Sequence, residues 1–223
     1  SFLFVGLIVS TFGWQWGFVV AAAAGGAGAV LILLTVSDTP ESRGLPSIQQ
    51  LSGEQVKTVD KMPTRELQKM IFKHPGIWVI AFSSAFIYIT KYAIAGWGVL
   101  FLQKERAFSL EQATQIIAFS AVFGVLGTVL AGWLSDRVFN SDRIRPAILS
   151  GAVSFVSLAL FLFAGGGYMM NILYVSVFSL SIGVLYCIVA GLMAVDIVPR
   201  KATGAALGIV GISSYIAAGL QDI

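Results

Sequence analysis

Apolar stretches of about membrane-spanning length recur along this chain, and they constrain its fold more than any other feature. A helix needs about 20 apolar residues to cross the hydrocarbon core of a bilayer. Stretches near that length occupy residues 18–36, 77–102, 109–134, 147–164 and 172–195, and a further one begins at 204 and runs to 220. Of all residues 57% are hydrophobic and 11% are charged, against about 25% charged in soluble domains. We therefore predict an all-α membrane protein.

The two ends of the chain and one polar stretch suggest how it is divided. Residues 1–12 are apolar but too short to span, and residues 221–223 close the sequence within an apolar helix. From these ends we expect an internal piece of a longer membrane protein. Residues 13–17 are typical of a turn that carries two tryptophans at a headgroup boundary. Residues 37–76 form a proline-containing polar linker, and residues 64–72 within it have the spacing of a short amphipathic helix.

The basic residues concentrate in alternate loops. They lie in the linker, in residues 137–145 and in residues 200–201, whereas the intervening loops hold few. Because positively charged loops stay on the cytoplasmic side, we predict that these three segments are cytoplasmic. The net charge of +3 follows from this topology. No basic patch is interleaved with aromatic residues, so nucleic acid is not an expected partner.

Lys91 is a lone charge in the middle of the stretch 77–102. At about 1.5 Å per residue it lies about 17–21 Å from either end of the helix, too far for its side chain to reach water. A charge at that depth costs at least about 2.5 kcal/mol and persists mainly where it faces a polar cavity or a partner. Small or polar-tipped residues share its helical face, namely Ser84, Tyr88, Ala95 and Gly98. We interpret Lys91 as a site for an anion, with pairing to an acidic residue on another helix as the alternative.

Residues with catalytic or metal-binding chemistry are scarce. Cys187 lies alone in an apolar run, which gives neither a disulfide nor a thiolate metal site. His74 is the single histidine and has no companion ligands, so we interpret it as a residue at the membrane interface. No nucleophile has a base partner. We predict no enzyme, no cofactor and no metal.

Residues 132–146 form the strongest local motif, in which a glycine near a helix end precedes an Asp–Arg pair and further basic residues. Its members are Gly132, Asp136, Arg137, Arg143 and Arg145. The pattern resembles the cytoplasmic loop motif of the major facilitator superfamily. We expect Gly132 to permit close approach of helices and Asp136 to face the N-terminus of a neighbouring helix. Asp136 and Arg137 would form part of a cytoplasmic latch.

Other glycines recur within the predicted spans. They are Gly25, Gly26, Gly28, Gly124, Gly127, Gly204, Gly208 and Gly211. Small residues let helix backbones approach closely in membranes, so we expect these positions to lie at helix contacts.

A narrower resemblance covers nearly the whole chain. Residues 38–46, 88–97, 132–146 and 198–208, with Tyr215, are similar to segments of the organophosphate:phosphate antiporters, whose family includes glycerol-3-phosphate and hexose-6-phosphate transporters and a hexose-phosphate sensor. The resemblance implies a partial major facilitator superfamily fold, from the end of the fifth helix to most of the eleventh. Residues 1–36 would end the N-terminal helical half, residues 37–76 would be the cytoplasmic central linker, and residues 77–223 would form the C-terminal half without its last helix.

This resemblance also implies a function. The protein would exchange a sugar phosphate or glycerol phosphate for inorganic phosphate by alternating access, as a multi-pass protein of a bacterial inner membrane. Lys91 matches the family's phosphate-binding position on the seventh helix, Tyr88 matches a family tyrosine, and Tyr215 would face the cavity. The second basic residue of the site would come from the first helix, in the N-terminal half outside this chain. Asp222 is a candidate gating residue, or merely an outer-end carboxylate. A membrane sensor of hexose phosphate and a facilitator for another organic anion are the alternatives.

Overall fold

The computed structural model describes residues 12–36, 44, 46 and 63–221. Asp222 and most of the linker motif at residues 38–46 lie outside this part, so their predicted roles stay predictions. The chain forms two compact units, Ser1–Lys57 and Thr58–Ile223, and each is described here by itself.

Helices long and apolar enough to cross a membrane account for most of the described residues. Six segments qualify: Trp14–Thr35, Pro75–Arg106, Leu110–Val138, Ile144–Ala164, Tyr168–Asp196 and Arg200–Leu220. No strand occurs in the described parts of the chain. The predicted all-α membrane fold is confirmed.

The first unit contributes helix α2, Trp14–Thr35. The turn predicted at residues 13–17 is wrong beyond its first residue, because the helix already begins at Trp14. Gly13 alone makes the turn, with a φ of 92° that favours glycine. Within this unit none of the α2 residues is buried, and a Cβ at Gly25, Gly26 or Gly28 would meet no described atom within 4 Å.

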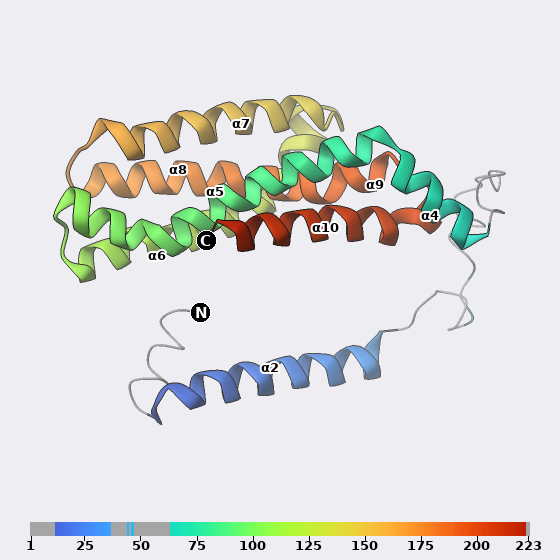
Figure 1. Cartoon of the computed structure of the whole chain (residues 1–223), viewed down its shortest axis with the longest axis horizontal. Coiled ribbons are helices and arrows are strands. Elements are labelled where there is room, and N and C mark those ends of the chain that lie inside the picture. Colours follow the sequence, from blue (N-terminus) through green and yellow to red (C-terminus); the bar gives the residue numbers. More distant parts are fainter. Residues whose placement is uncertain (1–11, 37–43, 45, 47–62, 222–223) are drawn as a thin grey trace. The chain divides into compact units, whose positions relative to one another are not determined.

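The second unit is a helical bundle (Figure 1). Its elements are α4 (Thr64–Lys73), α5 (Pro75–Arg106), α6 (Leu110–Trp133), η3 (Leu134–Val138), α7 (Ile144–Ala159), η4 (Leu160–Ala164), α8 (Tyr168–Cys187), η5 (Ile188–Met193), α9 (Ala194–Asp196), η6 (Arg200–Ala202) and α10 (Thr203–Leu220). Helix α8 packs against α6, α7 and α5, and α5 packs against α10 and α6. The amphipathic helix predicted at residues 64–72 is confirmed as α4.

Local sequence signals set several helix ends. Ser109 and Gln112 form a capping box at the start of α6, in which the Gln112 backbone N–H donates to Ser109 Oγ at 3.2 Å. Gly165 and Gly166 have φ values of 70° and 117° and make the turn between η4 and α8. Arg106 reaches this turn from the end of α5 and donates to the carbonyls of Phe161 and Leu162 at 3.2 and 3.0 Å.

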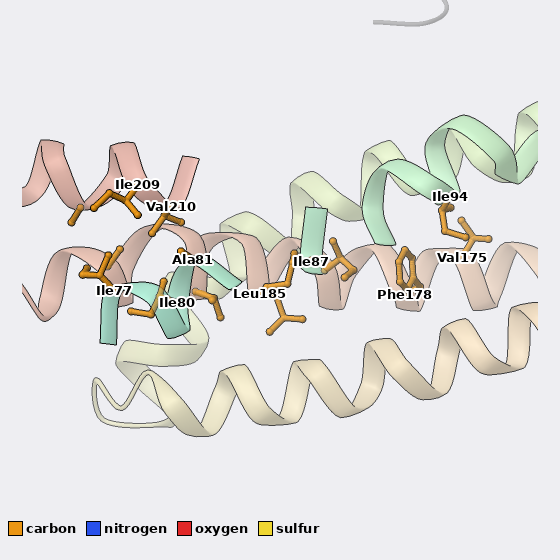
Figure 2. Packing of buried hydrophobic residues seen from close by; sticks show 14 of the residues in the cluster. Ile77, Ile80, Ala81, Ile87, Ile94, Val175, Phe178, Leu185, Ile209 and Val210 are labelled. Carbon is orange, nitrogen blue, oxygen red and sulfur yellow. The ribbon is translucent and has the colours of Figure 1, made fainter. Parts of the chain in front are cut away.

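The core of the second unit lies where α5, α8 and α10 meet. Figure 2 shows Ile77, Ile80 and Ala81 of α5 close to Ile209 and Val210 of α10, with Leu185, Phe178 and Val175 following along α8. Large apolar side chains also cover the outside, for example Phe82, Phe86, Phe155 and Phe163 at 63–84% exposure. An apolar exterior around a packed interior is what a lipid solvent requires.

Glycines bring α6 and α8 into backbone contact. A Cβ at Gly127 would lie 2.0 Å from the Leu180 carbonyl oxygen, and a Cβ at Gly183 would lie 2.3 Å from the Gly124 oxygen. The predicted close-packing role is therefore confirmed for Gly127. For Gly132, Gly204, Gly208 and Gly211 an added Cβ meets no atom within 4 Å in the described structure, so their close-packing role stays a prediction. Spacing along one helix does not reveal which face a neighbour covers.

Candidate functional site

Lys91 lies on α5 against aromatic rings. Its Nζ atom is 4.3 Å from the ring centroid of Tyr186 on α8 and 5.7 Å from that of Tyr92 on its own helix. An ammonium over a ring face is attracted by the ring quadrupole, by about 0.5–2 kcal/mol depending on desolvation. Lys91 itself is exposed on the surface of the second unit. The aromatic rings hold the charge in place without neutralising it.

Tyr88 is the centre of this aromatic cluster. Its ring stacks on Tyr186 at 4.8 Å, meets Tyr215 edge-on at 5.5 Å and lies 6.0 Å from Tyr92. The Tyr88 and Tyr186 hydroxyls are hydrogen-bonded to each other. Tyr88 is 6% exposed, whereas Tyr215 is 63% exposed. We call Tyr88, Lys91, Tyr92, Tyr186 and Tyr215 the tyrosine–lysine cluster, and it joins α5, α8 and α10.

The electrostatics of the cluster favour an anionic ligand. No carboxylate of the described residues lies within ion-pair distance of Lys91. The pairing of Lys91 with an acidic residue, the alternative drawn from the sequence, is thus absent from the described part of the chain. A phenol hydroxyl can donate a hydrogen bond and an ammonium donates three. The cluster therefore offers several donors and one unneutralised positive charge on a single face.

A hydrogen bond between two serines connects α5 and α10 beside this cluster. The Oγ atoms of Ser84 and Ser214 are 2.7 Å apart, and both side chains are fully buried. Ser214 Oγ also donates to the Val210 carbonyl at 2.7 Å. Since Ser84 lies one turn before Tyr88 and Ser214 immediately precedes Tyr215, this contact fixes the two tyrosines relative to each other.

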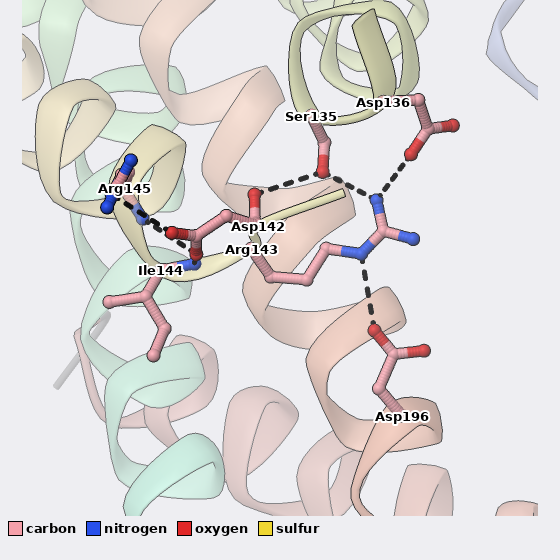
Figure 3. Close-up of polar contacts among 7 residues, drawn as sticks. All are labelled: Ser135, Asp136, Asp142, Arg143, Ile144, Arg145 and Asp196. Atoms are coloured by element: carbon pink, nitrogen blue, oxygen red, sulfur yellow. Dashed lines mark hydrogen bonds and ion pairs between the residues drawn. The ribbon is translucent and has the colours of Figure 1, made fainter. Parts of the chain in front are cut away.

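A second polar cluster lies at the η3–α7 loop (Figure 3). The Arg143 guanidinium donates to Asp136 Oδ1 at 2.8 Å, to Ser135 Oγ at 2.5 Å and to Asp196 Oδ2 at 3.2 Å. Hydrogen bonding to Asp136, and then to Asp196, raises the pKa of Arg143 above its ordinary value. Arg143 thus links the end of α6–η3 to α9, and it stays charged at physiological pH.

The carboxylate of Asp136 pairs with a more distant arginine than its sequence neighbour Arg137, and the predicted latch role of Asp136 and Arg137 stays a prediction. Asp136 pairs with Arg143, and Arg137 forms no ion pair among the described residues. The backbone explains the choice, because Asn140 and Ser141 have φ values of 50° and 65° and reverse the chain. The reversal carries Arg143 back toward η3, where Ser135 Oγ also donates to the Asp142 carbonyl at 3.3 Å.

Asp142 orders the start of α7 on the other side of the same loop. Its Oδ1 atom accepts from the backbone N–H groups of Ile144 and Arg145 at 2.8 and 3.4 Å. Its Oδ2 atom pairs with Arg145 Nε at 3.1 Å, although Arg145 is 76% exposed. A carboxylate at a helix N-terminus satisfies backbone donors that have no partner within the helix. Arg145 therefore supports this cap and takes no part in the Arg143 cluster.

The sequence matches the Major Facilitator Superfamily over residues 1–221. The chain belongs to the Major Facilitator Superfamily. This membership agrees with the described helices, and it makes the chain part of a multi-pass membrane protein. Among the described residues no group of three or more His, Cys, Asp or Glu side chains is placed to hold a metal ion.

Individual relatives narrow the branch of the superfamily. The glycerol-3-phosphate transporter of Bacillus subtilis is 34% identical over 194 residues, which cover 83% of this chain and 43% of that protein. The hexose-6-phosphate:phosphate antiporter of Salmonella typhimurium is 33% identical, with 81% and 40% covered. The membrane sensor protein UhpC of Escherichia coli is 25% identical, with 94% and 49% covered. The resemblance to organophosphate:phosphate antiporters is confirmed, and the chain spans less than half the length of each of these relatives.

Three residues predicted from the sequence to bind substrate lie in one cluster in the structure. They are Tyr88, Lys91 and Tyr215. The structure separates Gly98 from them, because Gly98 is buried and a Cβ there would lie 2.7 Å from Ile117 Cδ1 on α6. Sequence reasoning missed Tyr186. Its polar hydroxyl in the middle of an apolar stretch was the signal that could have marked it as a site residue.

Asp196 was also missed by sequence reasoning. It is an acidic residue at the end of an otherwise apolar span, and in the structure it is the second carboxylate partner of Arg143. Charged residues at such positions tend to be paired or functional.

Proposed function

We propose that this chain supplies most of the C-terminal helical half, residues 77–223, of an antiporter that exchanges a phosphorylated small organic compound for inorganic phosphate. Sugar phosphates and glycerol phosphate are the substrates we expect, by analogy with the named relatives. Alternating access would proceed by rocking of two helical halves about a midplane site. The observation that carries the proposal is Lys91, an unneutralised cation at mid-span, surrounded by tyrosines.

Lys91 is proposed to bind the phosphate dianion. A phosphoryl group that approaches the exposed ammonium exchanges the weak attraction of the aromatic rings for a charge-assisted hydrogen bond, which is roughly twice as strong as a neutral one. Tyr215 is exposed beside Tyr88 and can donate its hydroxyl to the same ligand. Lysine is a point charge and lacks the planar fork of arginine, so orientation of the phosphate would fall to these hydroxyls.

The resemblance to the family also implies a second cation on the first helix of the N-terminal half. Two cations would match the charge of a phosphate monoester dianion better than one. We therefore propose that Lys91 holds one side of the phosphate, and that the other side is held by a residue that precedes this chain in the whole transporter.

The test uses the full-length protein in vesicles loaded with radioactive inorganic phosphate. External glycerol 3-phosphate or glucose 6-phosphate should release the label from vesicles that contain wild-type protein. Lys91→Ala should abolish exchange, Lys91→Arg should retain part of it, and Lys104→Ala, at the exposed end of the same helix, should behave as wild type. Equal amounts of inserted protein must be confirmed by blotting. Exchange by Lys91→Ala at wild-type affinity would refute the phosphate role.

A membrane sensor is the second candidate function. Its specific support is the membrane sensor protein UhpC, whose aligned region covers 94% of this chain. A sensor would bind glucose 6-phosphate through the same cluster but exchange it slowly or not at all. Saturable binding without release of internal phosphate would therefore favour the sensor.

The loop cluster is proposed to hold the basic end of the C-terminal half closed. Arg143 bridges Asp136 and Asp196, which lie on segments far apart in the sequence. We place this end in the cytoplasm, because the basic loops gather there, and the membrane would be a bacterial inner membrane, as the bacterial relatives suggest. The ion pairs would have to open when the site faces the cytoplasm.

A further inference from the structure

Helix α4 presents two different faces. Leu67 and Ile71 are each 1% exposed and pack toward η6 and α10 of the second unit. Arg65, Lys69 and Lys73 recur every four residues on another side, so they form one stripe along the helix. The buried face fixes α4 to the bundle and leaves the basic stripe outward.

The basic stripe borders a hollow. A depression of about 330 Å³ is lined by Arg65, Gln68, Lys69, Phe72 and Lys73. No acidic side chain lines it, and none of its three cations forms an ion pair with another described residue. Its volume is at the lower end of that of small-molecule sites. The hollow thus combines positive charge with one aromatic wall.

Two aromatic residues indicate the depth of the hollow in a membrane. The Phe72 and Trp78 rings lie 6.5 Å apart, and Trp78 Nε1 donates to the Phe72 carbonyl at 2.8 Å. Trp78 lies in the first turn of the span Pro75–Arg106, and both rings are partly exposed, at 59% for Phe72 and 39% for Trp78. Tryptophans with one polar bond and one apolar face settle at the headgroup level. The hollow therefore opens where headgroups lie.

We propose that this hollow binds the headgroup of an anionic phospholipid, with its acyl chains along Phe72 and Trp78. The charge of the lining selects an anion, and the exposed aromatic pair at the start of a span favours a lipid over a free phosphate. Each cation near an anionic membrane surface contributes about a fivefold gain in binding, so three contribute about a hundredfold. This site is separate from the tyrosine–lysine cluster and does not depend on which substrate is exchanged.

The test titrates the delipidated full-length protein in detergent with dioleoylphosphatidylglycerol or dioleoylphosphatidylcholine and counts bound lipids by native mass spectrometry. Wild-type protein should prefer the anionic lipid. The triple variant Arg65→Gln, Lys69→Gln, Lys73→Gln should lose most of that preference, by tenfold to a hundredfold. The single variants Lys69→Gln and Lys104→Gln form a matched pair, because both lysines are exposed and only Lys69 lines the hollow.

Several outcomes would overturn the proposal. One is an unchanged preference in the triple variant, and another is an equal loss in Lys69→Gln and Lys104→Gln. Displacement of the anionic lipid by millimolar inorganic phosphate would assign the hollow to a free anion instead. Lys69→Arg keeps the charge and should bind as wild type, which separates a lost cation from a misfolded helix.

Discussion

The contact between α6 and α8 gives the sharpest prediction about stability. In Gly127→Ala the new Cβ would lie 2.0 Å from the Leu180 carbonyl oxygen and 2.9 Å from its carbon. Both are backbone atoms that no rotamer change can move. An ordinary contact needs about 3.4 Å or more, so the two helices would have to separate by more than about 1 Å. Overpacking of this kind costs about 1–3 kcal/mol and occasionally more.

A second glycine on the same helix supplies the matched control. In Gly124→Ala the new Cβ would meet only the Ser179 oxygen, at an ordinary 3.8 Å. Both substitutions gain helix propensity, by up to about 1 kcal/mol, and this gain cancels when the two variants are compared. We therefore expect Gly127→Ala to be less stable than Gly124→Ala by about 1–3 kcal/mol.

The measurement is equilibrium unfolding of the full-length protein in mixed micelles, followed by circular dichroism. Loss of stability should be specific to Gly127→Ala, with retention of helical content before unfolding. Equal free energies of unfolding for the two variants would mean that α6 and α8 do not meet at the distance that the structure gives.

Individual contacts give four further predictions. Tyr186→Phe removes the hydroxyl bonded to Tyr88 but keeps the ring, and should leave substrate binding within a few-fold of wild type. Tyr186→Ala also removes the ring attraction that the ligand displaces from the lysine ammonium, and should strengthen phosphate binding by a few-fold to about tenfold, as measured by binding titration. Arg106→Ala removes two hydrogen bonds to carbonyls and should lower the free energy of unfolding by about 1–3 kcal/mol. Arg143→Met should speed hydrogen exchange in the η3–α7 loop, and Arg137→Met should not. Because hydrogen bonding to Asp136 and then to Asp196 raises the pKa of Arg143 above its ordinary value, the guanidinium keeps its charge and its bonds from neutral into alkaline pH, so exchange protection should not fall between about pH 7 and pH 10.

The fold was predictable from the sequence because a lipid bilayer allows few backbone structures. Long apolar stretches must be helices, and local signals bound them, such as the cap at Ser109 that begins α6 and the turn at Gly165 that follows η4. The start of α2 was misjudged at Trp14, since tryptophans at a headgroup boundary fit a turn and a first helical turn equally well. The glycines were only partly predictable, because a close contact such as Gly127 with Leu180 depends on a helix distant in the sequence.

Reasoning from the residues themselves predicted the candidate site on one helix only, and Tyr215 on α10 was added by the family resemblance. Lys91 was visible as an energetic anomaly, and Tyr88 lies one turn away on the same face. Tyr186 enters the cluster through the packing of α8 on α5, which no local spacing encodes. The loop shows the same limit, since the left-handed backbone at Asn140 and Ser141 decides which arginine meets Asp136.

In the proposed transporter, the tyrosine–lysine cluster would couple ligand binding to helix arrangement. Lys91 and Tyr88 belong to α5, whereas Tyr186 belongs to α8, which the glycine contacts hold against α6. A ligand that draws the ammonium away from Tyr186 removes one attraction between α5 and α8 and leaves the α6–α8 contact unchanged. A ligand shifts a conformational equilibrium only through such a difference in interaction between two states. We therefore expect two pairs of helices to move relative to each other when ligand binds. One pair is α5 and α10, the other is α6 and α8, and each pair should move as a unit.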